Sequence, residues 1–240
     1  MRIIISLLLL TGIFTAASPQ ELADILKSAH EHHQALRDSI RDMFMIREAT
    51  IFSGNDTTGI LFTKMTRGEL VREETTTLDP DTSNGNNGPV SVIELFDGKS
   101  EWQVNALQGK VRMGGGGRRF QSPAVEYWID PPENSVILGS EIMHNRDCWI
   151  IESTPTPAYN YSRVWIDKEY YMMIRVESWD EQHNPTVVEN TNLWYVLDDF
   201  AIPSRTVIKK QWRPAMELVI KELRVNQGLP DSLFDADKLP

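Results

Sequence analysis

The chain of 240 residues has little of what would place it in several common functional classes. Its single cysteine, Cys148, excludes an internal disulfide framework and any metal cluster built from several cysteines. Lysine and arginine number 24 against 34 aspartates and glutamates, and the net charge of −10 argues against a basic surface that binds nucleic acid or anionic lipid headgroups. What is present is an ordinary globular composition, 41% hydrophobic and 24% charged.

Motifs that carry enzymatic chemistry are also missing. The sequence has no GxSxG motif and no carboxylate pair with an interpretable spacing, so we expect no enzyme, no cofactor and no metal. His30 and His33 have the three-residue spacing of helical metal ligands, but neither a cysteine nor an HExxH motif completes a site. We predict that His30, His32 and His33 form a solvated, pH-responsive face, and that Cys148 is a buried small hydrophobe and not a nucleophile.

The first 17 residues have the layout of a secretory signal peptide. Arg2 supplies a positive charge, an apolar stretch covers 3–14, and small residues follow up to Ala17. The apolar stretch is shorter than the roughly 20 residues of a membrane-spanning helix. We predict cleavage after Ala17, which divides the chain into a signal peptide at 1–17 and one exported domain at 18–240.

One helix and then many strands are expected along the domain. Pro19 suits a first helical position, and Leu22 and Leu36 fall on one apolar stripe of a helix that ends near residue 42. Beyond it the apolar period changes from 3.6 towards 2, and turn sequences such as Asp97-Gly98 separate the segments. Sequential hairpins predict an antiparallel meander. The predicted strands are 43–52, 59–66, 69–78, 90–96, 101–106, 110–113, 136–143, 147–153, 162–167, 171–179, 187–197, 204–211 and 216–225.

The late strands carry apolar residues on both faces. In 171–179, Met172, Ile174 and Val176 alternate on one face, whereas Met173 and Trp179 are apolar on the other. In 216–225, Met216, Leu218 and Ile220 share one face, and Val219, Leu223 and Val225 share the other. A sheet with one solvated face would show polar residues on its second face. Two interpretations therefore stay open: a barrel or sandwich filled by its own side chains, and a curved sheet whose concave face lines an apolar ligand cavity.

A glycine run, Gly114–Gly117, is followed by Arg118 and Arg119. Backbone N–H groups and guanidinium groups of this kind can cradle a phosphate. The run lacks the GxxxxGK[ST] pattern, and a flexible hinge is the favoured interpretation. If the ligand has a phosphate headgroup, these arginines are the first candidates to contact it.

Four motifs, taken in order along the chain, carry a resemblance to a known family. They are DGKSEW at 97–102, RVWIDKEY at 163–170, IPS at 202–204 and NQGLPDSLF at 226–234. In content and order they resemble the outer-membrane lipoprotein-sorting protein family, relatives of the periplasmic lipoprotein carrier. The resemblance covers most of 20–236 and is strongest in the last third.

The resemblance implies a mainly antiparallel α+β fold, an incomplete, unclosed β-barrel with helices covering its concave face. It implies a periplasmic protein that carries lipid acyl chains or lipoproteins in an apolar cavity toward the outer membrane, or that serves a lipid-exporting permease. The protein would then be a monomer, and its partner would be an inner-membrane permease or an outer-membrane receptor. The alternative is a periplasmic signalling module that senses lipoproteins and binds an anti-sigma factor.

Candidate site residues come from the resemblance and from the apolar faces together. Arg67 is the nearest match, by order along the chain, to the arginine that holds the lid of the founding carrier, although no proline follows it. The lid hinge is expected at Gly114, Gly115, Gly116 and Gly117. The expected ligand contacts are Arg67, Trp102, Met172, Ile174, Met216, Leu218 and Ile220.

Overall fold

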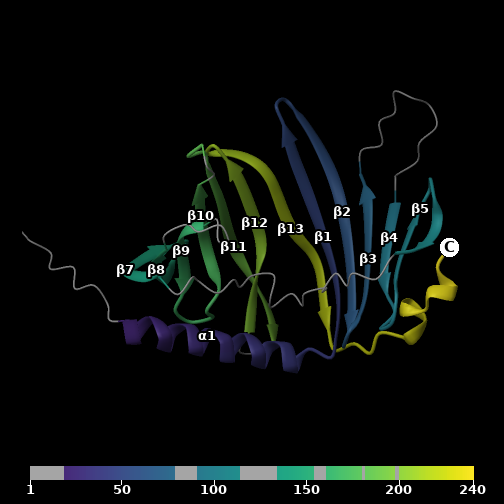
Figure 1. Ribbon diagram of the computed structural model, residues 1–240, viewed down its shortest axis with the longest axis horizontal. Coiled ribbons are helices and arrows are strands. Elements are labelled where there is room, and N and C mark those ends of the chain that lie inside the picture. The colour runs from purple at the N-terminus through teal and green to yellow at the C-terminus, as the bar shows by residue number, and fades with distance from the viewer. Residues whose placement is uncertain (1–18, 79–90, 114–133, 154–160, 180–181, 198–199) are drawn as a thin grey trace, which may run out of the picture.

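The computed structural model describes residues 19–78, 91–113, 134–153, 161–179, 182–197 and 200–240 (Figure 1). The predicted signal peptide at 1–17 and the predicted hinge at Gly114–Gly117 lie outside the described residues. Within the described ranges, no helix is both long and apolar enough to cross a membrane.

A single α-helix, α1 (Pro19–Ser39), precedes thirteen strands in the described part of the chain, where the resemblance implied several helices. Each of the thirteen predicted strands overlaps one of these. Two short 3₁₀ helices, η2 (Asp231–Phe234) and η3 (Ala236–Lys238), follow the last strand. The strands are β1 (Asp42–Ser53), β2 (Asp56–Arg67), β3 (Leu70–Thr77), β4 (Ser91–Phe96), β5 (Glu101–Asn105), β6 (Gly109–Arg112), β7 (Val136–Met143), β8 (Arg146–Glu152), β9 (Tyr161–Asp167), β10 (Met173–Trp179), β11 (Pro185–Leu197), β12 (Phe200–Lys210) and β13 (Arg213–Val225).

All thirteen strands form one sheet, in the order β6-β5-β4-β3-β2-β1-β13-β12-β11-β10-β9-β8-β7. Neighbours in this order are neighbours in the sequence except at one place, where β1 pairs with β13, and every pairing is antiparallel. Strands β6 and β7 are the two ends of the sheet and are not hydrogen-bonded to each other, so the curved sheet in Figure 1 is an unclosed barrel. The predicted meander and fold class are confirmed.

We call the face of the sheet that contacts α1 the inner face. The first half of α1 packs on the C-terminal strands, and Leu36 near its end packs on the central strands. Side chains alternate along a strand, and directly paired residues of neighbouring strands lie on the same side of the sheet. The contacts with α1 therefore define the inner face of every strand in the sheet. The first cluster is Leu22, Ile25, Ala29, Ile137, Ile151, Val164, Ile166 and Met173. The second is Leu36, Met43, Met45, Ile202 and Ile220.

The opposite, outer face is covered over β1 to β5 by the C-terminal segment, which we define as residues 229–239. Phe234, Ala236 and Leu239 are buried there against Met65 and Leu95. Figure 1 shows this segment, in yellow, on the outside of the strands that include β3, β4 and β5. The molecule therefore buries apolar side chains on both sides of its sheet.

Two residues join the two ends of the meander. The Asn226 side chain accepts a hydrogen bond from the Arg41 N–H at 2.7 Å and donates one to the Ser39 carbonyl at 2.9 Å. The Asp42 carboxylate accepts hydrogen bonds from the N–H groups of Gln227 and Gly228. Asn226 and Gly228 adopt positive φ angles of 57° and 74°, which only a few residue types adopt easily. The first half of the NQGLPDSLF motif thus links α1, β1 and β13.

A bulge in β10 changes the faces expected from alternation. Met173 pairs with Ile166 and Arg175 pairs with Trp165, so Ile174 is an extra residue in the strand. Ile174 therefore packs on the outer face, whereas Val176 packs against the inner cluster. The prediction that Ile174 and Val176 share a face is wrong, because an extra residue shifts the alternation by one.

A second bulge lies in β13. Met216, Leu218 and Ile220 share the inner face, as predicted, because they pair with Ile51, Ala49 and Arg47 of β1. The register then skips Lys221, so Leu223 and Val225 pair with Met45 and Met43 and return to that same face. Their expected place on the opposite face is wrong for the reason given for β10.

The histidine cluster of α1 is not a solvated face. His30 is exposed, but the side chain of His33 is only 6% exposed, and its Nε2 lies 2.9 Å from the Tyr171 carbonyl oxygen. His32 is half-buried, with its ring beside Tyr171 and Phe200. Burial of His33 lowers its pKa below 6.5, partly offset by the contact with the Tyr171 carbonyl. No group of three or more metal-ligating side chains forms within the described residues.

We expect the protein to lose stability in mild acid because of His33. The unfolded chain binds a proton near pH 6.5 and the folded chain only at lower pH, so the free energy of unfolding falls as pH drops below 6.5. The slope contributed by this one group is at most about 1.4 kcal/mol per pH unit. Urea unfolding between about pH 7 and pH 5 measures it. A slope in His33→Gln equal to that of the wild type would contradict the assignment to His33, and His30→Gln serves as the matched exposed control.

Candidate functional site

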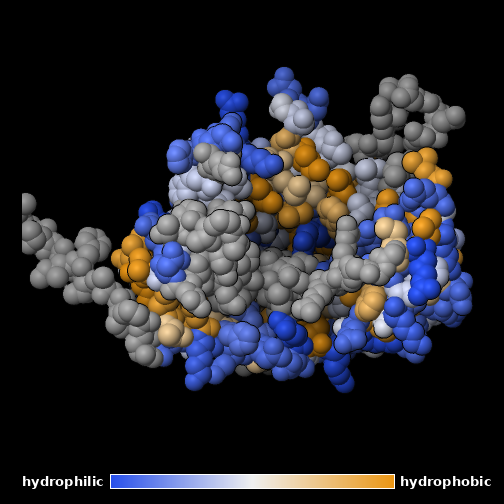
Figure 2. All heavy atoms as spheres, viewed as in Figure 1, coloured by the Kyte–Doolittle hydropathy of each residue, from blue (hydrophilic) through white to orange (hydrophobic). Residues whose placement is uncertain are grey.

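An apolar strip crosses the inner face beyond the residues that pack on α1. Val188, Ile208, Met216 and Ile51 form one cross-strand row over β11, β12, β13 and β1. All four side chains are half-buried, and none belongs to the clusters that α1 covers. Figure 2 shows hydrophobic side chains gathered over the central strands, above a hollow in this face. We call this row and the adjoining Leu218, Ala49, Ile60 and Phe62 the apolar strip.

A polar row continues the inner face over β1 to β5. The strand register places Met45, Lys64, Glu73, Glu94 and Gln103 side by side in one line. Lys64 is buried, and its Nζ lies 3.1 Å from a Glu73 carboxylate oxygen. Gln103 donates a hydrogen bond of 3.2 Å to Glu94. We call Lys64, Glu73 and Glu94, together with Arg47 in the next inner-face row of β1, beside Phe62, the charged row.

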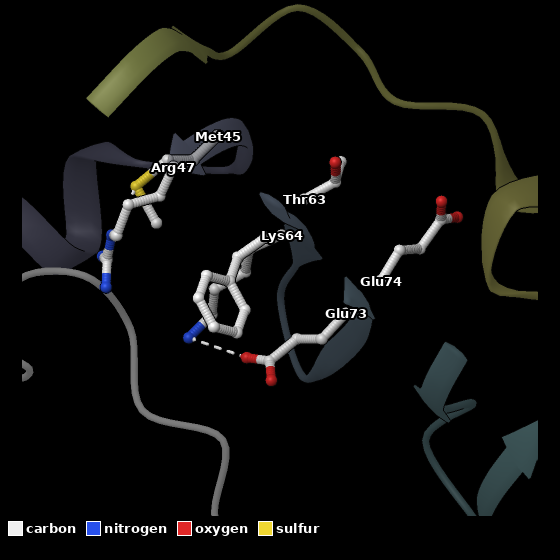
Figure 3. A pocket seen from close by; sticks show the side chains of 7 residues that line it. Met45, Arg47, Thr63, Lys64, Glu73 and Glu74 are labelled. Carbon is white, nitrogen blue, oxygen red and sulfur yellow. Dashed lines mark hydrogen bonds and ion pairs between the residues drawn. The ribbon is translucent and has the colours of Figure 1, made fainter. Parts of the chain in front are cut away.

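A cavity of about 200 Å³ lies where the apolar strip meets the charged row. Figure 3 shows Arg47, Lys64 and Glu73 projecting to one side of the sheet and Thr63 and Glu74 to the other. The lining residues are Met45, Arg47, Phe62, Thr63, Lys64, Glu73 and Glu74. Because pockets for small ligands typically hold about 300–1,000 Å³, this cavity has room for one part of such a ligand and not for a whole one.

The predicted ligand contacts divide between the two faces. Met216, Leu218 and Ile220 lie on the inner face, the first two within the apolar strip and Ile220 next to α1. Met172 and Ile174 lie on the outer face with Cys148, Trp165 and Ala201. The structure therefore brings together three of the seven predicted residues at the cavity side and places these two away from it.

Trp102 also lies on the outer face, within the DGKSEW motif. Its Nε1 donates a hydrogen bond of 2.9 Å to the Asp97 carboxylate, which also accepts the N–H groups of Lys99 and Ser100. Partial burial acts to raise the pKa of Asp97, but these hydrogen bonds outweigh it and lower the pKa below 3.8. The motif fixes the turn between β4 and β5, which explains its residues without a ligand.

Arg67 holds the C-terminal segment on the outer face. Its Nη1 donates a hydrogen bond of 2.7 Å to the Leu229 carbonyl and forms an ion pair with Asp231. Its guanidinium also lies over the Phe234 ring, 5.4 Å from the centroid. Arg72 donates to the Leu233 carbonyl in the same way. Arg67 thus contacts the second half of the NQGLPDSLF motif and lies on the face opposite the cavity.

The charged row was missed by the sequence predictions, although one signal was present. Ile60, Phe62 and Lys64 alternate in β2, so a strand with an apolar inner face ends in a lysine on that same face. The ion-pair partner of Lys64, Glu73, comes from β3, and Glu94 lies one strand farther, on β4; no local pattern relates either of them to β2. Only the register of three hairpin-linked strands aligns Lys64, Glu73 and Glu94.

Comparisons with known proteins support the fold. A family model described only as an uncharacterized protein matches residues 132–240. No curated protein matches the chain. A crystal structure of a DUF1329 family protein from Desulfovibrio piger is 16% identical, with a TM-score of 0.61 over 93% of this chain and 100% of that one.

Two further crystal structures are similar. One, described as a candidate outer membrane lipoprotein-sorting protein domain from Vibrio parahaemolyticus, is 17% identical, with a TM-score of 0.60 over 92% of this chain and 98% of that one. The other, a LolA superfamily protein from Nitrosomonas europaea, is 12% identical, with a TM-score of 0.52 over 89% of this chain and 99% of that one. These neighbours match the family that the four motifs resemble, and they confirm that resemblance at the level of the fold.

Replacing Arg67 should loosen the C-terminal segment without affecting the inner face. Arg67→Met removes a charge-assisted hydrogen bond and an ion pair, so the free energy of unfolding should fall by about 1–2 kcal/mol. Amide hydrogen exchange should rise in 229–239 and stay at the wild-type level in the inner-face segment 216–220. Unchanged exchange in 229–239 would contradict the assignment of Arg67 to this segment.

Cys148 should be unreactive in the native protein. Its side chain is fully buried, and burial, with a smaller contribution from the nearby Asp167 carboxylate, raises the pKa of its thiol to about 11. A neutral, buried thiol is a poor nucleophile. We expect a thiol reagent such as dithiobisnitrobenzoate to label the protein only in denaturant. Rapid stoichiometric labelling of the folded protein would contradict this assignment.

Proposed function

We propose that this protein is a periplasmic binding protein that holds the acyl chains of a lipid or lipoprotein against the inner face of its unclosed barrel. The observation that carries the proposal is the apolar strip. Its members span five adjacent strands, lie outside the packed clusters and are half-buried, except for the fully buried Ala49. Two structural neighbours, described as a lipoprotein-sorting domain and a LolA superfamily protein, support it.

The strip has the chemistry that acyl chains require. Its eight members are aliphatic or aromatic side chains and one methionine, and the flexible thioether of Met216 adapts to chains of different shape. Burying one methylene group contributes about 0.8 kcal/mol, so a 14-carbon chain contributes on the order of 10 kcal/mol before the costs of binding. A few good contacts along the strip therefore suffice for stable binding.

A carrier must also release its cargo. The proposal places the lid hinge at Gly114–Gly117, whose glycines would let the connection between β6 and β7 move. Residues 1–17 would direct export to the periplasm, and an inner-membrane permease or an outer-membrane receptor would donate or accept the lipid. The role is one of binding and transfer, without a catalytic step.

A polar substitution in the apolar strip tests the proposal. Leu218→Asn should weaken binding of a 14-carbon fatty acid about tenfold, because it removes about 1.4 kcal/mol of apolar contact. Displacement of a fluorescent fatty acid measures the affinity. The matched control is Val219→Asn, in the same strand with its side chain on the outer face, where it pairs with Glu48 and Arg205.

Thermal unfolding followed by circular dichroism checks that both variants are folded. Equal loss of affinity in the two variants would show that the effect is structural and would contradict a ligand site on the inner face. Mass spectrometry of lipids that co-purify with the wild-type protein gives independent support. A protein that purifies without lipid and binds no fatty acid would contradict the proposed function altogether.

A further inference from the structure

The charged row is an unusual feature on the inner face of an acyl-chain carrier. Lys64 is only 8% exposed, lies in line with Ile60 and Phe62, and takes its charge partner Glu73 from the next strand. Removing an ion pair from water costs several kcal/mol per ion, and apolar side chains in the same place would stabilise a fold at least as well. The row is therefore better explained by a ligand that needs charge than by stability.

The order of the charges across the sheet is specific. The apolar strip ends on β1 and β2, which also carry the two cations, Arg47 and Lys64. The two carboxylates, Glu73 and Glu94, follow on β3 and β4, farther from the strip. From the apolar strip towards β4, the side chains are therefore first apolar, then positively charged and then negatively charged. The charged row has two cations and two carboxylates.

A phospholipid that ends in ethanolamine has the complementary order. Its acyl chains are followed by a phosphate, which is negative, and then by an ammonium group, which is positive and has three N–H donors. A phosphate beside Arg47 and Lys64 gains charge-assisted hydrogen bonds, and an ammonium beside Glu73 and Glu94 does the same. Neighbouring strands are about 4.8 Å apart, so the long side chains of the row can reach both groups of one headgroup.

We propose that the charged row binds the phosphoethanolamine headgroup of a lipid whose acyl chains lie on the apolar strip. The cavity of about 200 Å³ that Arg47, Lys64 and Glu73 line is the headgroup end of the site (Figure 3). The assignment rests on the proposed function, since it needs the acyl chains on the strip. It adds a preference among lipids, which the apolar strip alone cannot supply.

The experiment compares lysophospholipids that share one 14-carbon chain and differ only in the headgroup. We expect calorimetry to show that the wild-type protein binds the ethanolamine form at least fivefold more tightly than the glycerol form. Glu94→Gln should reduce this ratio to near one by weakening the ethanolamine form alone. The matched control is Glu217→Gln, a carboxylate on the outer face of β13 that does not line the cavity and forms an ion pair with Arg205.

A second variant tests the assignment without leaving a buried charge unpaired. The double exchange Lys64→Glu with Glu73→Lys keeps an ion pair but reverses the order of charge. It should also abolish the preference for ethanolamine while preserving fatty acid binding. A folded double variant that retains the fivefold preference would overturn the assignment.

Two outcomes separate this inference from the proposed function. Equal affinity of the wild-type protein for both lysophospholipids overturns the headgroup preference and leaves acyl-chain binding intact. Failure to bind either lysophospholipid, or any fatty acid, contradicts the proposed function as well.

Free phosphoethanolamine, which has no acyl chain, tests whether the protein binds the headgroup alone. It should compete only at concentrations at least a hundredfold higher, and competition at equal concentration would overturn a lipid as the source of the headgroup.

Discussion

The antiparallel pairing of β1 with β13 is the interaction on which the rest of the structure depends. It is the one place where strands distant in the sequence are neighbours, and it joins β1–β6 to β7–β13 in a single sheet. Asp42 and Asn226 fix the junction through hydrogen bonds to the backbone on both sides. This pairing uses one edge strand of each half. The unpaired edges of the sheet are therefore β6 and β7, and the barrel is open between them.

The same pairing builds the candidate site. The apolar strip comes from β11, β12 and β13 together with β1 and β2, whereas the charged row comes entirely from β1 to β4. The N-terminal half by itself carries the charged row but only the β1 and β2 end of the apolar strip. When β1 meets β13, the apolar residues of the C-terminal half continue into the charges of the N-terminal half, and the combined surface matches a molecule with an apolar chain and a polar head.

Two described elements, α1 and the C-terminal segment, cover different parts of the sheet. The helix α1 packs across the inner face at Leu22, Ile25 and Leu36, and the C-terminal segment covers the outer face of β1 to β5. Arg67 and Arg72 hold that segment through its carbonyl oxygens. The apolar side chains on the two faces therefore fall into two groups. Most are covered by α1 or by the C-terminal segment, whereas the apolar strip is covered by neither of these elements.

Local pattern was sufficient for the elements and insufficient for the site. Alternation and turn residues located every described strand, because the period of apolar residues depends on neighbours in the chain. Alternation failed at Ile174 and at Lys221, since a bulge depends on how two strands pair and leaves no trace in one of them. Trp102 and Arg67 carry family motifs, but those motifs fix a turn and a terminal segment on the outer face.

For the described part of the chain, the sequence by itself determined one helix followed by an antiparallel meander, and that Met216, Leu218 and Ile220 share a face. These properties follow from periodicity within single segments. Only the tertiary structure decided that this face is the inner one, that Cys148 and Ile174 lie on the other, and that Lys64 meets Glu73 near the apolar strip. Which side of a strand becomes the inside depends on where α1 packs and how β1 pairs with β13, and both are contacts between residues far apart in the chain.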